Sequence, residues 1–594
     1  MMKVKYNPWD SYYKNPFGAI KINTTVSWAI DVDESVDRVN LVLTKAGEHP
    51  VAYQMLTDKT KRHYQTNVLI TSSGLYHYYF EIQKNNQAFY FVQCEDELGR
   101  VVTEFDQIVQ FQLTCYDQKV PVVDWYRQGI VYQIFPDRFA NGNKHGEVIG
   151  RKRNSFIYAT KEDTPYYITD KDGAISRWDF FGGNFAGIRK KLPYLKKLGI
   201  TILYLNPIFL ATSNHRYDTN DFMQIDPMLG SEEDFKQLLD ELHRNGMYLI
   251  LDGVFNHVGY DSKYFQGAIS GQSNQYYPWF MFNNYPTDYQ SWWGVSTLPE
   301  VDKNNLAYQK LIYGADGVLD KWTKFGVDGW RLDVADELPM FFLKDIRVRL
   351  AQNNCQIEIG EVWEDASHKY VNDELRTYTS GDNLTGVMNY PVRSFILQLL
   401  QAGSHAQTKR AVIDFLRLVE NYPTDFLLNC LNNIGTHDTA RIKTTLNEDE
   451  KMVALAMELL FMLPGVPCIY YGDEAGLSGK TDPDNRRYFP WGRESKFLEQ
   501  KVSQWCKFRK ETPALLDGRT GILMDSQGLI GIVRYNKQKI IIYLCNKSEQ
   551  ELHVDPKLLE FYALPQEVKQ QLLAHAKQRM IKPKDGLVIV DERN

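Results

Sequence analysis

The sequence predicts an α/β protein built on a (β/α)8 barrel of the TIM type, with an inserted subdomain after the third barrel strand, an N-terminal β-sandwich and a C-terminal all-β domain. Three observations predict this architecture. Short strand-like segments fill the start of the chain, eight apolar runs alternate with helical sequence in its middle, and hairpin-like sequence returns near its end. We expect domains at residues 1–122, 123–510 and 511–594, with the insertion at 258–303.

Composition excludes several classes of function. Of the 594 residues, 43% are hydrophobic and 24% are charged, as in soluble globular proteins, and the net charge of -6 comes without a basic run that would bind nucleic acid. No apolar run is long enough to span a bilayer, and the first residues reach no apolar core before Asp10, so we expect no membrane anchor and no signal peptide. Seven scattered cysteines without CxxC spacing indicate reduced thiols in a cytoplasmic protein.

The N-terminal segments have the texture of short antiparallel strands. They are rich in β-branched and aromatic residues, and Gly, Asn and Asp turns separate them. The segments are 19–32, 38–47, 74–83, 87–96 and 106–116. This pattern predicts a β-sandwich like that of a carbohydrate-binding module, followed by a linker at 117–129.

The middle of the chain alternates between strands and helices. Residues 184–199 show an amphipathic helical pattern, and a second helical segment begins with a capping-box pattern at Ser231 and Asp234 and ends at Gly246. Nearly continuous apolar runs are typical of parallel strands buried on both faces. The eight runs occupy residues 129–139, 200–209, 247–257, 327–334, 356–363, 385–390, 428–438 and 467–474, each separated from the next by helical sequence.

One connection, 258–303, is far longer than an ordinary βα loop. Its aromatic cluster predicts a small subdomain over the barrel mouth: Tyr276, Tyr277, Trp279, Phe280, Trp292 and Trp293. Residues 518–548 have β-hairpin texture and predict the C-terminal all-β domain.

Polar side chains fall repeatedly at the carboxyl ends of the predicted strands, which converge on one cleft in such a barrel. They are Asp252, Asn256 and His257 on the third strand, Arg331 and Asp333 on the fourth, Glu361 on the fifth, and His437 and Asp438 on the seventh. A single Arg and Asp pair would equally suit a structural salt bridge, but agreement among several strands favours catalysis. Paired carboxylates with a third acid and aromatic surroundings indicate cleavage of a glycosidic bond.

Four segments in order, "DGVFNH", "GWRLDVADE", "GEVW" and "NIGTHD", resemble the signature segments of the α-amylase superfamily. Further matches, "VYQIFPDRFANG", "SNHRYDTNDF" and "LPGVPCIYYGDEAG", are similar to the branch of neopullulanases, cyclomaltodextrinases and maltogenic amylases. The resemblance implies a retaining glycoside hydrolase that cleaves cyclodextrins, pullulan, starch and maltooligosaccharides and can transfer glycosyl groups.

The same resemblance implies roles for individual residues. Asp333 would be the nucleophile, Glu361 the general acid and base, and Asp438 the stabiliser of the oxocarbenium-like transition state. Residues expected to bind the substrate are Tyr217, Asp252, His257, Arg331, His437, Asp482 and Arg486. Side chains two apart on a strand share a face, so Arg331 is expected beside Asp333.

Relatives often bind calcium through Asn and Asp residues in the loop after the first strand and an Asp in a later "GGD" segment. Here the oxygen donors are Asn141, Asn143 and Asn184, without the carboxylate that a tight calcium site needs. We therefore expect no required cofactor. Members of this branch usually carry a "MPKLN" segment before the fourth strand, whereas this chain has "LPEVD" at 298–302. This difference bears on substrate preference.

The expected partners are α-glucan oligosaccharides and, from the resemblance, a second copy of the chain in a homodimer. Two alternatives stay open within the enzyme class, a starch-directed α-amylase and an α-1,6-oligoglucosidase. Outside that class, the alternative is an inactive amylase-like scaffold that binds carbohydrate.

Overall fold

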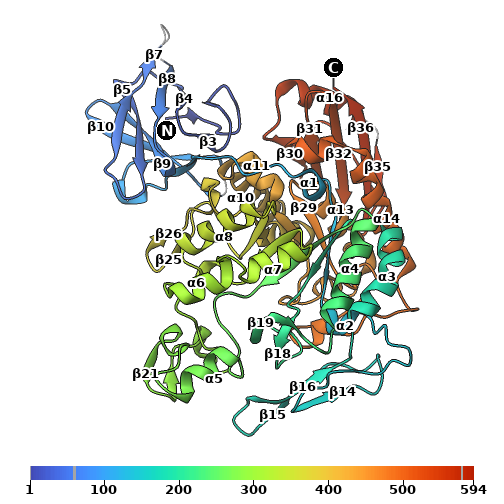
Figure 1. Cartoon of the computed structure of the whole chain (residues 1–594). Helices are drawn as coiled ribbons and strands as arrows, with labels where there is room; N and C mark the ends of the chain where they lie inside the picture. The colour runs from blue at the N-terminus through green and yellow to red at the C-terminus, as the bar shows by residue number, and fades with distance from the viewer. Residues whose placement is uncertain (1, 58–61, 96, 577–578, 594) are drawn as a thin grey trace.

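A closed barrel of eight parallel strands forms the centre of the molecule, which confirms the predicted fold class. The computed structural model describes residues 2–57, 62–95, 97–576 and 579–593. The barrel strands pair in chain order: β13 (Val131–Ile134), β17 (Ile202–Leu205), β20 (Tyr248–Gly253), β23 (Gly329–Leu332), β24 (Ile357–Val362), β27 (Gly386–Asn389), β28 (Leu431–Asn433) and β29 (Val466–Tyr470). Figure 1 shows the barrel with the N-terminal and C-terminal domains beside it.

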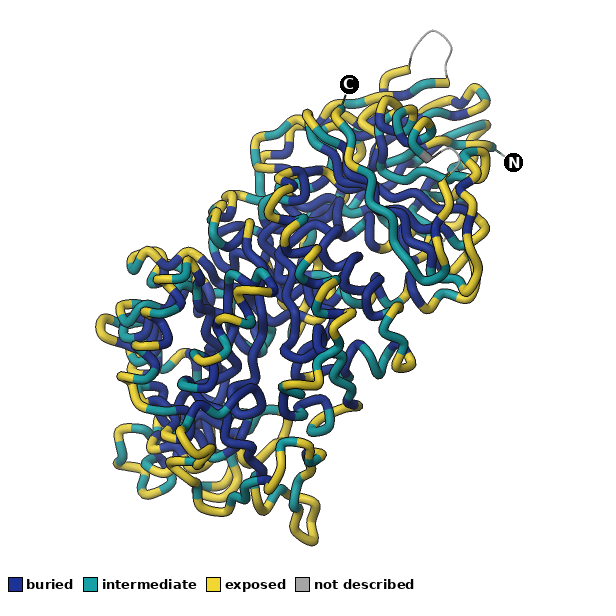
Figure 2. The backbone as a smooth tube through the Cα atoms, turned by 90° about the vertical axis from the view of Figure 1, so that its right-hand side faces the viewer, coloured by how far each residue is buried: buried dark blue, intermediate teal, exposed yellow. Residues whose placement is uncertain are grey.

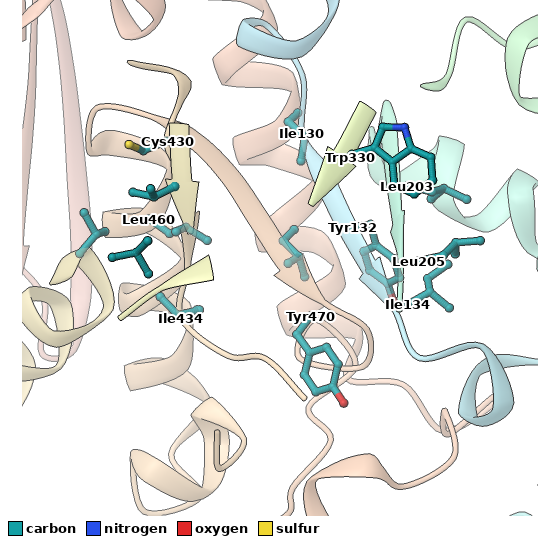
Figure 3. Packing of buried hydrophobic residues seen from close by; sticks show 14 of the residues in the cluster. Ile130, Tyr132, Ile134, Leu203, Leu205, Trp330, Cys430, Ile434, Leu460 and Tyr470 are labelled. Carbon is teal, nitrogen blue, oxygen red and sulfur yellow. The ribbon is translucent and has the colours of Figure 1, made fainter. Parts of the chain in front are cut away.

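Alternate residues of the barrel strands pack on opposite sides of the sheet. Val131 and Ile202 belong to the cluster of side chains inside the barrel. Their neighbours Tyr132 and Leu203 point outward into the core beneath the helices (Figure 3). Both faces of the barrel strands are buried, and in Figure 2 buried residues fill the middle of the molecule. The strands therefore read as continuous apolar runs in the sequence.

Helices cover the outside of the barrel: α3 (Phe185–Leu198), α4 (Glu232–Arg244), α6 (Leu306–Tyr313), α7 (Val318–Phe325), α8 (Met340–Gln352), α9 (Tyr390–Gln401), α10 (His405–Asn421), α11 (Thr424–Asn429), α13 (Glu450–Met462) and α14 (Lys496–Glu511). The predicted capping box at the start of α4 is present, because Ser231 and Asp234 each accept a hydrogen bond from the other's backbone N–H. This cap fixes the start of the helix that follows the second strand.

The fifth βα unit departs from the expected alternation. Between β24 and β27 the chain forms a small hairpin of β25 (Tyr370–Val371) and β26 (Glu374–Leu375) and a short 3-10 turn, η5 (Tyr378–Ser380), in place of a helix. The N-terminal domain packs here, where the Gln118 N–H donates to the Ser380 carbonyl at 3.0 Å. Gly381 has a φ of +93°, and a Cβ there would lie 1.9 Å from the Gln118 carbonyl oxygen, so this approach requires glycine.

A second long insertion, at 140–184, was not predicted. It forms a three-stranded sheet of β14 (Ser155–Ile157), β16 (Ile175–Phe180) and β15 (Ile168–Thr169) beside the barrel mouth (Figure 1). Buried ion pairs attach it to the barrel, since Arg138 Nη2 lies 2.9 Å from Asp179 Oδ2 and the ammonium of Lys152 bonds to Asp226. The sequence of this insertion lacks a long apolar pattern that would have revealed it.

The predicted insertion at 258–303 forms a subdomain with α5 (Lys263–Ser270), β21 (Phe282–Asn284), β22 (Asp288–Tyr289) and the 3-10 turns η2 (Tyr277–Trp279) and η3 (Trp292–Gly294). Most of its aromatic rings fold inward. Trp279 stacks on Tyr264 with centroids 5.3 Å apart, and Phe280 meets Phe265 edge to face at 4.9 Å. The remaining tryptophans, Trp292 and Trp293, contact His257 and Glu337, respectively.

The N-terminal domain packs two sheets face to face, one around β4 (Thr24–Val32) and β8 (His63–Ile70), the other around β5 (Arg38–Lys45), β9 (Gly74–Lys84), β10 (Gln87–Val92) and β12 (Phe111–Tyr116). Trp28 and Tyr78 lie in their shared core. A buried contact ties this domain to α10, because Glu420 accepts hydrogen bonds from Lys14 Nζ at 2.6 Å and Trp9 Nε1 at 3.0 Å. Trp9 therefore packs against its own barrel.

The C-terminal domain is a five-stranded sheet in the order β34 (Glu560–Tyr562), β30 (Arg519–Met524), β31 (Leu529–Tyr535), β32 (Lys539–Asn546) and β36 (Asp585–Glu592). A two-stranded sheet of β33 (Leu552–His553) and β35 (Met580–Ile581) accompanies it, together with the helices α15 (Ala514–Asp517) and α16 (Gln566–Ala576). An all-β domain was predicted here, so these helices were not expected. Within the described ranges, every helix is too short or too polar to cross a bilayer.

Candidate active site

One buried arginine gathers three carboxylates at the mouth of the barrel. Arg331 Nη1 lies 2.7 Å from Asp252 Oδ1 and 2.8 Å from Asp333 Oδ1, and Nη2 lies 2.9 Å from Glu361 Oε2. The first two contacts are hydrogen bonds, whereas the Glu361 contact is an ion pair without hydrogen-bond geometry. Parallel pairing brings the carboxyl ends of β20, β23 and β24 side by side, which is why residues far apart in sequence meet here.

The turn after Asp333 orients the second carboxyl group. Val334 adopts a φ of +39°, which is rare for a β-branched residue and marks local backbone strain at the site. In this conformation its N–H donates to Glu361 Oε2 at 2.8 Å. Trp363 Nε1 donates to the other oxygen, Oε1, at 3.1 Å, and its ring stacks on Tyr390 with centroids 3.8 Å apart. Glu361 is therefore held at both oxygens.

Burial and the charge of Arg331 act in opposite directions on the pKa values of Asp333 and Asp252. Burial raises the pKa of Asp333 well above its usual value; Arg331 opposes this rise, and the charges of Glu361 and Asp252 add to it. Burial also raises the pKa of Asp252, again opposed by Arg331. Burial therefore favours the protonated forms of Asp333 and Asp252, and the guanidinium of Arg331 favours their ionised forms.

Asp438 is the third acid of the predicted set, and it lies across the cleft beside Arg486. Burial and then the charge of Glu361 raise the pKa of Asp438 to about 7, while Arg486 and Arg331 lower it. Arg486 Nη2 lies 3.5 Å from Asp438 Oδ1, and its Nη1 lies 2.9 Å from Asp482 Oδ1. Asp438 thus titrates in the physiological range.

His437 is neutral and fixed in one orientation. Burial, together with the positive charges of Arg486 and Arg331, lowers its pKa well below the usual value. Gln133 Nε2 lies 3.0 Å from His437 Nδ1, so the amide donates and the ring proton is assigned to Nε2, 3.2 Å from Asp438 Oδ2. The ring also stacks on Tyr217, with centroids 5.2 Å apart and planes 2° apart.

Tyr217 and Asp252 form one hydrogen-bonded unit. Asp252 Oδ2 accepts from the hydroxyl of Tyr217 at 2.8 Å and from that of Tyr204 at 2.7 Å. Together with Arg331, these donors stabilise its ionised form against burial. The sequence analysis missed Tyr204, since a tyrosine within an apolar strand has no distinguishing pattern.

His257 is buried and neutral beneath the inserted subdomain. Burial, and then the charge of Lys303, lowers its pKa to about 3. Its ring stacks on Trp292 with centroids 5.3 Å apart. Among the described residues His257 Nε2 has no hydrogen-bond partner, so it is available to a hydroxyl group of a bound molecule. Lys303, from the segment after "LPEVD", bonds to Asn256 Oδ1 at 2.8 Å.

Asp482 and Arg486 receive a partner from the unpredicted insertion. The hydroxyl of Tyr167 donates to Asp482 Oδ1 at 2.8 Å. Tyr167 also meets Trp178 edge to face, and Trp178 meets His215 in the same way. Tyr167 and Trp178 thus connect the inserted sheet to the site through Asp482 and His215.

The three asparagines suggested as calcium ligands lie close together, but side-chain oxygens among them accept hydrogen bonds from backbone N–H groups nearby. Asn184 Oδ1 accepts from the N–H groups of Gly142 and Gly187, capping α3, and Asn141 Oδ1 accepts from the Asn143 N–H. The ammonium of Lys190 donates to the Gly142 carbonyl. A neutral donor set next to a lysine does not fit a hard cation, which prefers several carboxylate oxygens.

The structure thus brings all ten predicted catalytic and substrate-binding residues to one end of the barrel. Their chemistry, rather than a deep cavity, locates the site. A cavity of about 590 Å³ lies elsewhere, between the N-terminal domain and helices α9 and α10, and it reaches the cluster only at Trp363. A cluster of acids, neutral histidines and aromatic rings suits the binding of an uncharged, hydroxyl-rich molecule.

Comparisons with known proteins agree with this chemistry. Residues 133–513 match the family model described as alpha amylase, catalytic domain. The cyclomaltodextrinase of Geobacillus thermopakistaniensis is 31% identical over 497 residues, covering 82% of this chain and 76% of that protein. The amylopullulanase of Thermoanaerobacterium thermosulfurigenes is 32% identical over 613 residues, 89% of this chain. The chain spans only 32% to 46% of the length of the amylopullulanases that it matches.

Solved structures show the same similarity. The cyclic alpha-maltosyl-(1→6)-maltose hydrolase of Arthrobacter globiformis, in complex with that cyclic sugar, superposes with a TM-score of 0.68 at 28% sequence identity. The alignment covers 80% of this chain and 100% of that one.

Proposed function

Given that this chain belongs to the alpha-amylase family, we propose that it is a retaining α-glucan hydrolase that cleaves α-1,4-glucosidic bonds. The substrates are cyclodextrins, pullulan and maltooligosaccharides. The enzyme also cleaves some α-1,6-glucosidic bonds. The observation that carries the proposal is the contact of one buried guanidinium with Asp252, Asp333 and Glu361. This contact holds an attacking carboxylate and a proton donor close together, as double displacement requires.

In the first step, Asp333 attacks the anomeric carbon while the glycosidic C–O bond breaks. Glu361 gives its proton to the departing oxygen, so the leaving sugar departs as a neutral alcohol. In the second step, water attacks the glycosyl ester, Glu361 takes the proton of that water, and Asp333 departs as a carboxylate. Arg331 contacts both acids, and it stabilises the negative charge of Asp333 before the attack and after its departure.

The remaining residues bind the sugar at the point of cleavage. Asp438 accepts hydrogen bonds from sugar hydroxyls, and these strengthen as positive charge develops on the ring. Neutral His257 offers its unpartnered Nε2, and neutral His437 holds its Nε2–H beside Asp438. Tyr217 presents an aromatic face for the sugar, supported by its stack on His437.

We further propose that the enzyme requires no cofactor and acts as a cytoplasmic homodimer. The donor set of Asn141, Asn143 and Asn184 supports the first point. All seven cysteines are free, which suits a reducing compartment. Support for the dimer comes from the exposed side chains of Val51, Leu56 and Leu69 on the N-terminal sheets, apolar groups that a second copy would cover.

Product analysis tests the proposed function. The enzyme is incubated in parallel with β-cyclodextrin, pullulan and soluble starch, with Glu361→Gln as the blank. We expect β-cyclodextrin to be cleaved fastest, with panose released from pullulan and maltose from starch. Rapid attack on starch with long products and little cyclodextrin cleavage would instead identify a starch-directed amylase. Cleavage of α-1,6 bonds alone, with maltotriose from pullulan and no attack on β-cyclodextrin, would identify an oligoglucosidase. Absence of any product would identify a non-catalytic scaffold.

The pKa of Asp438 predicts how activity depends on pH. Its ionised form is the one that accepts hydrogen bonds from the sugar, so kcat/KM should fall as pH drops through about 7. Arg486 favours that ionised form, so Arg486→Gln should raise the pKa of Asp438 further and move the acid limb to higher pH. The measurement is kcat/KM on maltotriose from pH 5 to pH 9.

The matched control for this variant is Arg487→Gln. Arg487 is the next residue but pairs with Asp484, so it should leave the position of the acid limb in place. If Arg486→Gln lowers kcat/KM equally at every pH, Arg486 contacts the substrate without tuning Asp438.

A further inference from the structure

The cavity of about 590 Å³ between the N-terminal domain and helices α9 and α10 has no role in the proposed mechanism. Two domains that only pack together fill such a space with side chains, because close packing stabilises the interface. This cavity instead has the volume of an ordinary small-molecule site. The groups that line it indicate what it binds.

The wall that the N-terminal domain contributes is polar. Tyr76 and Tyr78 of β9 lie in the core of the sandwich, so His77 between them points from the opposite face of the strand toward the cavity. Gln112 of β12 lines the cavity in the same way. Gln110, just before β12, also lines it, and its Oε1 is buried without a hydrogen-bond partner among the described residues. Such an oxygen is costly unless another molecule donates to it.

The helical wall adds hydroxyl and amide groups beside aromatic rings. Ser394 and Gln398 lie one turn apart on α9, and Asn421 ends α10. Phe395 and Phe415, which stack with centroids 4.2 Å apart, line the same wall. Hydrogen-bonding groups next to flat apolar surface suit a sugar, which has hydroxyl groups around an apolar ring face.

The acidic side chains of the lining already have partners. Four acids line the cavity, and their partners are Lys14 for Glu420, Lys369 for Glu364, Ser367 for Asp365 and Arg417 for Asp414. A charged ligand would have to compete with these contacts, whereas a neutral ligand would leave them in place. The lining therefore favours an uncharged, hydroxyl-rich molecule.

One side chain joins the cavity to the catalytic cluster. Trp363 lines the cavity, and its Nε1 donates to Glu361 Oε1 at 3.1 Å. The Trp363 ring stacks on Tyr390, and Pro391, the next residue, lines the cavity as well. The cavity therefore adjoins the group at which the proposed reaction releases glucan fragments.

We propose that this cavity is a second binding site, separate from the catalytic cluster, for a short neutral glucan fragment such as maltose. The identity of the ligand rests on the proposed function, whereas the site itself does not require catalysis. One sugar hydroxyl donates to Gln110 Oε1 and so satisfies that oxygen. Other hydroxyl groups bond to Ser394 and Asn421.

Equilibrium dialysis with radiolabelled maltose tests the proposal. The parent protein is Asp333→Ala, in which the proposed nucleophile is absent and the ligand stays intact. We expect two maltose molecules per chain, one at the cluster and one in the cavity. Ser394 is exposed to the cavity, so adding Ser394→Trp should fill the space and leave one maltose per chain without lowering the melting temperature. Gln504→Trp is the matched control, because it places the same ring on the exposed face of α14, and it should keep both.

Gln110→Leu separates binding from a structural role. This variant removes the buried oxygen and keeps a side chain of similar size. Maltose at the cavity should bind about tenfold more weakly, because one hydrogen bond is lost. The melting temperature should stay unchanged or rise, because a buried oxygen without a partner destabilises the fold. A lower melting temperature with unchanged maltose binding would mean that Gln110 serves only the domain interface.

The stoichiometry decides between the outcomes. Fewer than two maltose molecules in the parent protein, or two in the Ser394→Trp variant, would overturn the inference. A protein that binds maltose in the cavity but cleaves no glucan would refute the proposed function and leave this site in place. An active enzyme that binds maltose only at the cluster would do the reverse.

Discussion

Asp333→Ala is expected to lower kcat/KM on maltooligosaccharides by roughly 10⁴-fold to 10⁶-fold, the scale on which loss of a covalent nucleophile acts. The physical reason is that the variant removes the carboxylate that attacks the anomeric carbon, while Arg331 keeps its contacts with Asp252 and Glu361. The site then retains its proton donor but lacks the group that forms the glycosyl ester.

Azide provides the positive test of this role. In Asp333→Ala the small anion can enter the space of the lost carboxylate and attack the substrate directly, in one displacement. We therefore expect azide to restore part of the activity and to give a β-glycosyl azide, whose configuration is inverted. An α-glycosyl azide, or more than about 1% residual activity without azide, would contradict the assignment, since a lost nucleophile costs far more than this.

Asp316→Asn is the matched control for the nucleophile variant. The Asp316 side chain is exposed and pairs only loosely with Lys324 at 3.4 Å, remote from the cluster. This substitution should leave kcat/KM within a factor of two, as expected for an exposed pair that contributes about 0–1 kcal/mol.

Glu361→Ala is expected to lower kcat/KM on maltooligosaccharides by about 10²-fold to 10⁴-fold, the range of general acid catalysis. The loss should depend on the leaving group. A sugar departs as an alkoxide unless Glu361 protonates it, whereas fluoride departs readily without a proton. Formation of the glycosyl ester from α-maltosyl fluoride should therefore be impaired least, which pre-steady-state release of fluoride would measure.

The product formed with azide distinguishes Glu361 from Asp333. In Glu361→Ala the ester on Asp333 still forms, and azide attacks it without needing a base. Two displacements give an α-glycosyl azide, in which the original configuration is retained. A β-glycosyl azide would mean that the two roles have been exchanged.

Glu364→Gln serves as the control for the acid variant. Glu364 lies three residues beyond Glu361, but its exposed carboxylate pairs with Lys369 and does not contact the cluster. Activity close to that of the wild type is expected here.

Much of the fold could be predicted because local sequence patterns indicate the barrel strands. The runs around Ile202–Leu205 and Tyr248–Gly253 are apolar on both faces, and their flanking helices carry their own caps, such as Ser231 with Asp234. These signals depend on neighbours a few residues away, so they survive without tertiary information. The acids at the strand ends could also be predicted from local sequence, since a charge at the end of a buried apolar segment has few structural explanations.

The insertion at 140–184 could not be predicted in this way. Its strands are short and partly exposed, and they are positioned by contacts with distant parts of the chain, such as Asn214 Nδ2 to Asp179 Oδ1 at 2.6 Å. The prediction of a helix in the fifth βα unit was wrong for a related reason. A helix was expected there from the regular alternation, but residues 363–385 have no helical apolar pattern, and the N-terminal domain covers that position instead.

By itself the sequence determined the eight-stranded barrel and the polar groups at the ends of its strands, because these features rest on local periodicity and on residue type. Tyr217, Asp482 and Arg486 were predicted only through the family resemblance. Only the tertiary structure decided how those groups influence one another. Sharing of Arg331 among three acids, the neutral state of His257 and His437, and the stack of Trp292 on His257 all depend on distances across the barrel. Electrostatic and stacking energies vary with such distances on the scale of an ångström, and a linear pattern of residues does not specify them.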